Sequence, residues 1–161
     1  FPGLQGGPHM HTMTAIAVAM AEANTPEFVA YATQVVKNAK ALAAKLMEFG
    51  FNLVTGGTDN HLILIDLRSK NIPGKKMAKA LDRARIVTNY NTIPGDTAPP
   101  MNPNGVRIGT PAISTRGMKE PEMAAIADMI AEVLMDIKNV DAAQSVRHRV
   151  LELTARFPLP Y

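Results

Sequence analysis

One arginine interrupts a short apolar stretch at residues 105–113, and its type and position suit ligand binding. Val106 and Ile108 alternate with Arg107, so a strand here would direct the two apolar side chains to one face and the guanidinium to the other. A guanidinium is planar and permanently charged, and its fork of donors matches a carboxylate. The pattern predicts a clamp for a small carboxylate, while a surface arginine on an edge strand also fits these residues.

Two adjacent glycines near the start of the chain could contact an anion. Gly6 and Gly7 precede Pro8, and a helix is predicted to begin directly afterwards. Glycine lets the backbone approach a ligand closely, and free N–H groups before a helix suit a phosphate. An ordinary turn explains the same short motif.

The remaining polar residues do not assemble into a catalytic motif. His9 and His11 are two residues apart, so on one helix they point to different faces, which is poor spacing for a metal site. With His61 they are interpreted as hydrogen-bonded structural histidines or as ring contacts, and His148 as an exposed histidine. Asp59 could act as an acid or base, but its position favours closing a turn. No metal site and no acid–base pair is predicted from spacing.

Composition excludes several classes of protein. The chain has 161 residues, a net charge of +3 from 17 basic and 14 acidic residues, and no cysteine, so no disulfide scaffold or thiolate site is possible. The basic residues are dispersed and the chain has no Trp for base stacking, which argues against a nucleic-acid partner. No apolar run has the length of a membrane span, and residues 1–8 do not form a signal peptide. Together these features favour a reducing, cytoplasmic location.

Hydrophobic periodicity predicts the elements that position these residues. Helices are expected at 9–23, 25–49, 74–84, 120–137 and 141–156, and strands at 51–54, 61–67, 86–88 and 105–109. A turn is expected at 56–60, a turn or short helix end at 114–117, and a long irregular loop at 89–104. The strand at 61–67 is nearly continuous in apolar residues, which predicts that both of its faces are covered. The expected fold class is α/β, with a small α+β domain of three or four strands covered by helices on one face and preceded by a long helix.

The helix at 9–23 is nearly free of charge, which distinguishes it from the other predicted helices. A helix of this kind must be buried over most of its surface. We therefore expect its partners to lie in further sequence or in another subunit.

Four stretches, at residues 1–11, 56–62, 89–94 and 105–117, together resemble serine hydroxymethyltransferase in order and spacing. The resemblance implies a fold-type I enzyme that uses pyridoxal 5'-phosphate and transfers the hydroxymethyl carbon of serine to tetrahydrofolate, giving glycine. It also implies that the chain is the C-terminal part of that enzyme. Residues 1–24 would end the cofactor-binding large domain, residues 25–49 would form an interdomain helix, and residues 50–161 would form the small domain.

The resemblance also implies roles for individual residues. Arg107 matches the arginine that binds the substrate carboxylate, and Asn91 matches a folate-binding asparagine. Gly6 and Gly7 match glycines that reach the cofactor phosphate from the neighbouring subunit of a homodimer or tetramer. Three further residues stand where many members contact the pterin: Pro99, Pro100 and Met101.

The family's Schiff-base lysine lies in a motif upstream of Phe1, so no catalytic residue is expected among these residues and the chain alone is expected to be inactive. Two other interpretations remain open from the residues. Another fold-type I enzyme acting on an amino acid would keep the role of Arg107 and lose that of Asn91. A non-catalytic α/β interaction module would keep only the fold.

Overall fold

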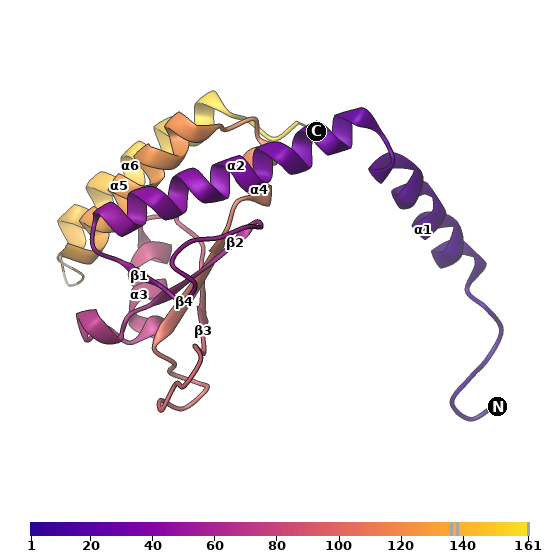
Figure 1. Cartoon of the computed structure of the whole chain (residues 1–161), viewed down its shortest axis with the longest axis horizontal. Helices are drawn as coiled ribbons and strands as arrows, with labels where there is room; N and C mark the ends of the chain where they lie inside the picture. Colours follow the sequence, from indigo (N-terminus) through magenta and orange to yellow (C-terminus); the bar gives the residue numbers. More distant parts are fainter. Residues whose placement is uncertain (136, 138, 161) are drawn as a thin grey trace. The chain divides into compact units, whose positions relative to one another are not determined.

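The computed structural model of the chain describes residues 1–135, 137 and 139–160 (Figure 1). The helices are α1 (Met10–Ala23), α2 (Pro26–Glu48), α3 (Gly74–Arg83), α4 (Pro111–Thr115), α5 (Glu120–Met135) and α6 (Val140–Arg156), with a 3₁₀ turn at Arg68–Lys70. The strands are β1 (Asn52–Leu53), β2 (Leu62–Asp66), β3 (Asn89–Asn91) and β4 (Gly105–Gly109). The chain divides into two compact units, residues 1–33 and 34–161, and the division falls within α2.

The second unit contains one antiparallel sheet with the strand order β1-β2-β4-β3. Strand β4 lies in its interior, so it is fixed by a neighbour on each side. Leu64 of β2 pairs with Arg107, and Asn89 of β3 pairs with the same arginine from the other side. The predicted α/β class and the predicted number of strands are confirmed.

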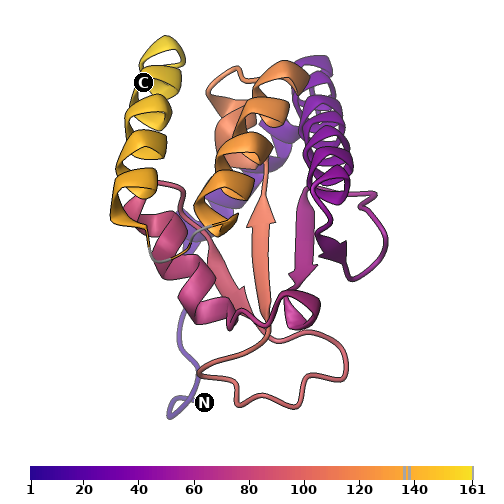
Figure 2. The same cartoon turned by 90° about the vertical axis from the view of Figure 1, so that its left-hand side faces the viewer.

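One face of the sheet carries the core. Ile63 pairs with Ile108 and Ile65 with Val106, and all four side chains are buried. They pack in one cluster with apolar residues of α2, α3, α5 and α6, and Figure 2 shows α3 and α5 in front of this side of the sheet. Burial of this kind of side chain is the main driving force of folding.

The opposite face is more open. Leu62 and Leu64 are half-buried and Arg107 is exposed. Both faces of the strand at 61–67 were predicted to be covered. Within residues 34–161 only the face with Ile63 and Ile65 is buried, and Leu62 and Leu64 lie half-buried on the face that Arg107 shares.

The predicted strand at 86–88 is wrong. The chain instead leaves α3 through Arg85, whose φ of 65° is left-handed, and the Ile86 N–H donates to the Leu81 carbonyl at 2.9 Å. The left-handed Arg85 and this hydrogen bond end the helix, so the pairing with β4 begins three residues after Ile86, at Asn89. The β-branched run favours a strand locally, but the partner strand decides where pairing starts. The predicted loop at 89–104 is correspondingly shorter, because residues 89–91 form β3.

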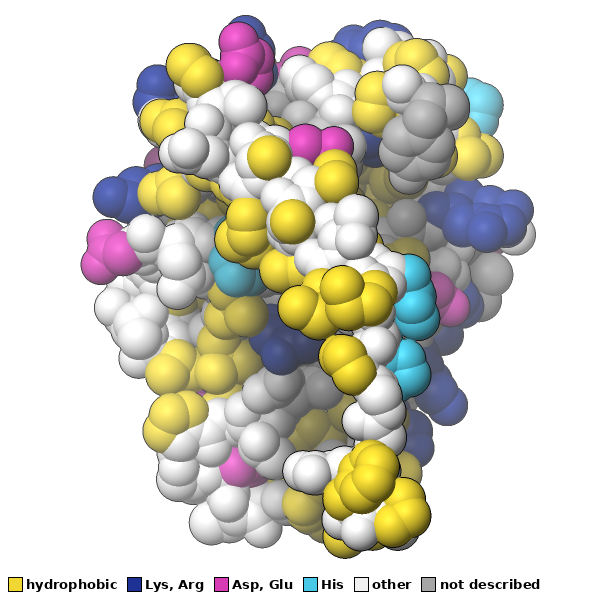
Figure 3. Space-filling model, turned by 90° about the vertical axis from the view of Figure 1, so that its right-hand side faces the viewer, with side chains coloured by type: hydrophobic (Ala, Val, Ile, Leu, Met, Phe, Trp, Pro, Cys, Tyr) yellow, Lys and Arg dark blue, Asp and Glu magenta, His cyan; other side chains and the backbone are white. Residues whose placement is uncertain are grey.

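Helix α1 has no buried residue within the first unit. Its large apolar side chains are between 53% and 63% exposed, and they are Met10, Met13, Ile16, Val18 and Met20. In Figure 3, which views the chain from the right-hand side of Figure 1, hydrophobic side chains gather along this helix. That further sequence or another subunit covers this surface stays a prediction.

Among the described residues, no helix combines the length and apolar character needed to cross a membrane.

The start of α3 contacts the backbone ahead of the arginine strand. The Gly74 N–H donates to the Pro103 carbonyl at 2.8 Å. A Cβ added to Gly74 would overlap the Gly105 carbonyl and lie 2.9 Å from the Pro103 oxygen. Only glycine lets the helix approach β4 this closely.

We therefore expect Gly74→Ala to lower the free energy of unfolding by about 1–3 kcal/mol, because the added methyl meets backbone that cannot rotate away. Urea unfolding of the chain measures this change. Gly3→Ala is the control, because its Cβ would meet nothing within 4 Å. Equal stability of the two variants would contradict the close approach of α3 to β4.

Candidate functional site

Arg107 lies at the centre of β4, on the open face of the sheet. Its side chain is exposed, and within the described part of the chain its guanidinium has no hydrogen-bond or ion-pair partner. Leu64 and Asn89 flank it on the neighbouring strands. The fork of donors is therefore available to a ligand.

The acidic residue at the end of β2, on the same face as Arg107, is already paired. Asp66 lies opposite Gly105, and its carboxylate accepts hydrogen bonds from the Arg68 side chain at 2.7–3.1 Å. The Arg68 guanidinium lowers the pKa of Asp66, so this carboxyl stays charged and bound to Arg68. Because Asp66 is satisfied by Arg68, it does not compete for Arg107.

Two glycines flank Arg107 on its own face, at i−2 and i+2. A Cβ at Gly105 would lie 2.5 Å from Ile93 Cγ2, and one at Gly109 would lie 3.2 Å from the His61 carbonyl oxygen. Ile93 is buried over the first glycine, and the His61 backbone lies against the second. The sequence interpretation did not identify Ile93 as part of this site. The Gly-x-Arg-x-Gly spacing is the signal that could have revealed it, because glycines on one face of a strand admit a close neighbour.

Asn91 ends β3 on the same face as Arg107. It pairs with Gly105, so the asparagine and the arginine are diagonal neighbours across β3 and β4. Its Nδ2 donates to the Thr92 carbonyl at 2.7 Å. The sheet thus brings together two of the residues singled out in the sequence.

Asp96 organises the loop that follows Asn91. Its carboxylate accepts from the backbone N–H groups of Asn104 and Ala98, each at 3.0 Å, from Asn104 Nδ2 at 2.8 Å and from the Ile93 N–H at 3.4 Å. These bonds, the Asn104 N–H first, lower the pKa of Asp96. One carboxylate therefore joins the two ends of the loop and holds Ile93 over Gly105.

The remaining predicted site residues lie outside the sheet that carries Arg107. Pro99, Pro100 and Met101 occupy the exposed outer part of the loop, where Met101 is 69% exposed. Gly6 and Gly7 belong to the first unit and are exposed, and a Cβ added to either would meet nothing within 4 Å. The local chain itself does not require glycine at these two positions.

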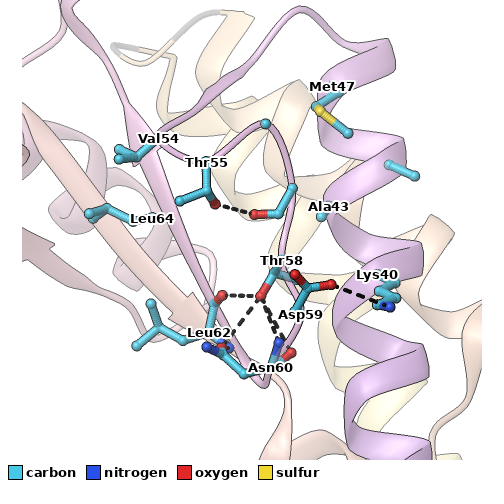
Figure 4. A pocket seen from close by; sticks show the side chains of 13 residues that line it. Lys40, Ala43, Met47, Val54, Thr55, Thr58, Asp59, Asn60, Leu62 and Leu64 are labelled. Atoms are coloured by element: carbon cyan, nitrogen blue, oxygen red, sulfur yellow. Dashed lines mark hydrogen bonds and ion pairs between the residues drawn. The ribbon is translucent and has the colours of Figure 1, made fainter.

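A hollow of about 620 Å³ lies between α2 and the loop from Val54 to Asn60 (Figure 4). Lys40 Nζ approaches Asp59 Oδ1 at 3.6 Å across it, and both side chains are exposed. Thr58 Oγ1 donates to the Leu62 carbonyl and Asn60 Oδ1 accepts from the Leu62 N–H, both at 2.7 Å. The expectation that Asp59 closes this turn is wrong, because Thr58 and Asn60 close it and Asp59 pairs with Lys40.

The four histidines lie at the surface, and their contacts do not form a metal site in the described structure. The rings of His9 and His11 contact each other edge to face at 5.6 Å, and His148 Nε2 lies 3.2 Å from Glu152. All four histidines are exposed. In residues 1–135, 137 and 139–160, no group of three histidine or acidic side chains is placed to hold a metal ion.

We expect Asp96→Asn to loosen the loop between β3 and β4, because one amide oxygen replaces two carboxylate oxygens that together accept four hydrogen bonds. Hydrogen exchange of the Ala98 and Asn104 amides measures this as lost protection. A carboxyl with a lowered pKa stabilises the folded state above its ordinary value of 3.8 and loses this effect as the pH falls through the lowered value. Protection at these amides should therefore fall in acid.

Asp59→Asn is the matched control, since Asp59 accepts no backbone hydrogen bond in the described structure. Unchanged protection in Asp96→Asn, or an equal loss in Asp59→Asn, would contradict this role of Asp96.

Comparison with known proteins agrees with the arrangement of these motifs. The family model for serine hydroxymethyltransferase matches residues 1–130. A serine hydroxymethyltransferase of Acidothermus cellulolyticus is 54% identical over 166 aligned positions, covering 99% of this chain and 39% of that protein. One of Sorangium cellulosum is 52% identical over 160, covering 99% and 38%. The chain thus spans about two fifths of the length of these curated relatives, and it belongs to the serine hydroxymethyltransferase family.

Proposed function

We propose that this chain supplies the substrate-carboxylate site of a serine hydroxymethyltransferase, an enzyme that interconverts serine and glycine with tetrahydrofolate as the one-carbon acceptor. The observation that carries the proposal is the exposed guanidinium of Arg107 at the centre of the open sheet face, which no described residue pairs with. Family membership and the pairing of Asp66 with Arg68 support it.

Arg107 acts by positioning. Its two parallel N–H groups bind both oxygens of the amino-acid carboxylate, which fixes the direction of the substrate Cα. Because β4 is held on both edges, the guanidinium starts from a rigid strand rather than from a loop. Pyridoxal 5'-phosphate, when bound, supplies the electron sink for breaking a bond at that carbon.

Gly6 and Gly7 would meet the cofactor phosphate from a neighbouring subunit. Neither N–H donates to another atom of the described chain, and there is open space around both residues. Since no described residue would meet a Cβ at either position, the close approach of an external group would account for glycine here. These residues therefore fit the phosphate of the cofactor.

Asn91 and the outer loop residues would face the folate. Asn91 is a diagonal neighbour of Arg107, so a ligand held there would lie beside the amino acid. Pro99, Pro100 and Met101 lie on the segment that Asp96 orders and would offer an apolar surface to the pterin. Tetrahydrofolate is the co-substrate in this proposal.

We propose the same family arrangement for the rest of the molecule. Residues 1–24 would end the cofactor-binding domain, residues 25–49 would link the domains and residues 50–161 would form the small domain. The apolar surface of α1 would be covered by the remaining polypeptide or by a second subunit of a cytoplasmic homodimer or tetramer.

Arg107→Ala should weaken serine binding by about 100-fold, on the order of 3 kcal/mol, because the carboxylate loses a bidentate, charge-assisted partner. The measurements are serine KM and glycine affinity. They are made in the longer protein that contains both this chain and the segment with the family's Schiff-base lysine. Affinity for pyridoxal phosphate should change much less.

Arg147→Ala on α6 serves as the control, because it removes an exposed arginine of the same charge outside the site. Equal losses of amino-acid and cofactor affinity in Arg107→Ala would contradict the carboxylate role.

The 161-residue chain by itself should not form a covalent adduct with pyridoxal phosphate, because none of its lysines lies in the family's Schiff-base motif. Absorbance spectra after incubation with the cofactor and gel filtration should show no bound chromophore. A retained visible band that borohydride reduction fixes to the chain would show that one of these lysines binds the cofactor and would overturn this part of the proposal.

A further inference from the structure

Two completely buried polar side chains connect α2 to the segment that directly follows the arginine strand. Thr110 and Asn38 are both 0% exposed. Buried polar groups destabilise a core unless they are hydrogen-bonded. Both are bonded, so their partners show what these two residues hold together.

Thr110 follows the last residue of β4 and makes two hydrogen bonds. Its N–H donates to the His61 carbonyl at 3.1 Å, and its Oγ1 donates to the Val35 carbonyl at 2.8 Å. The first bond extends the pairing of β4 with the start of β2. The second fixes the distance between the end of β4 and α2.

Asn38 makes a parallel connection one turn further along α2. Its Nδ2 donates to Ser114 Oγ and to the Met118 carbonyl, each at 2.8 Å, and its Oδ1 accepts from Gln34 Nε2 at 2.9 Å. Both amide hydrogens are therefore used to hold α4 and the turn after it. We call the contacts of Thr110 and Asn38 with Val35, Ser114 and Met118 the α2–α4 latch.

We propose that Thr110 is a positioning residue for carboxylate binding by Arg107, acting through the α2–α4 latch; this inference rests on the proposed function. Among the described residues Arg107 has no hydrogen-bond or ion-pair partner to orient it, so its direction depends on the backbone of β4 and on its neighbours across the sheet. The start of β4 is confined where Gly105 meets Gly74 and Ile93. Its end is held by Thr110.

The latch differs from the apolar contacts around it in its directionality. Apolar packing is non-directional, whereas a hydrogen bond fixes both distance and angle. A binding group must be held within about 0.5 Å of its productive position to keep its effect. Thr110 lies three residues after Arg107 in the chain, so loss of its hydroxyl would act on the guanidinium through the backbone at the end of β4.

The test uses two substitutions at Thr110 in the protein that also contains the lysine-bearing part. Thr110→Val removes the hydroxyl and keeps the shape, and we expect it to raise serine KM about tenfold with smaller changes in kcat and cofactor affinity. Thr110→Ser keeps the hydroxyl, so its serine KM should stay near the parent value. A serine KM in Thr110→Ser as high as in Thr110→Val would overturn the role of the hydroxyl.

Val146→Ala controls for general destabilisation, because Val146 is 0% exposed on α6 and does not belong to the latch. Its unfolding free energy should fall, as expected for a core truncation, while serine KM stays unchanged. A rise in serine KM equal to that of Thr110→Val would overturn the inference. If Thr110→Val does not fold, Ser114→Ala is used instead, because it removes one acceptor of Asn38. Serine KM should then rise by less than about tenfold. An unchanged serine KM would contradict the role of the α2–α4 latch.

The outcomes separate this inference from the proposed function. If Arg107→Ala leaves serine binding unchanged, the proposed function fails and the positioning role fails with it. If Arg107→Ala weakens serine binding and Thr110→Val does not, only the positioning role is overturned.

Discussion

The antiparallel pairing of β4 between β2 and β3 is the constraint on which the site depends. It places Leu64 and Asn89 on either side of Arg107 and buries Val106 and Ile108 on the opposite face. A shift by one residue would turn the arginine into the core and expose the two apolar side chains, at a large cost in free energy. The register that stabilises the core is therefore the same register that presents the guanidinium to a ligand.

The ends of this strand are held by two different physical means. At its start, Gly74 and Gly105 allow backbone and Ile93 to approach so closely that a methyl group would not fit. At its end, a buried hydrogen bond from Thr110 joins it to α2, and Asn38 of α2 donates to Ser114 and Met118, which follow Thr110 in the chain. Close packing and satisfied polar groups thus combine to hold one short strand, while its central charged residue, Arg107, has no hydrogen-bond or ion-pair partner in the described structure.

The sequence predicted the helices better than the strands. The helix at 25–49 is observed as Pro26–Glu48, because its apolar period, Thr25 cap and Pro26 act locally. The strand expected at 86–88 is found at Asn89–Asn91, because bonds that end α3 use Ile86. Likewise the turn at 56–60 was located correctly, but Thr58 and Asn60 rather than Asp59 close it. Alternatives of equal local propensity can be separated only by the contacts of the folded chain.

The sequence by itself determined which faces are apolar, where glycine and proline interrupt the elements, and that Arg107 alternates with core residues in a strand, since these follow from side-chain chemistry and the period of each element. Only the tertiary structure decided that Asp66 bonds Arg68, that Arg107 has no ion-pair partner among the described residues, that Ile93 lies over Gly105, and that Thr110 bonds to α2. These contacts join residues that β pairing and helix packing bring together from distant parts of the chain. Their distances depend on the whole core, which no local pattern specifies.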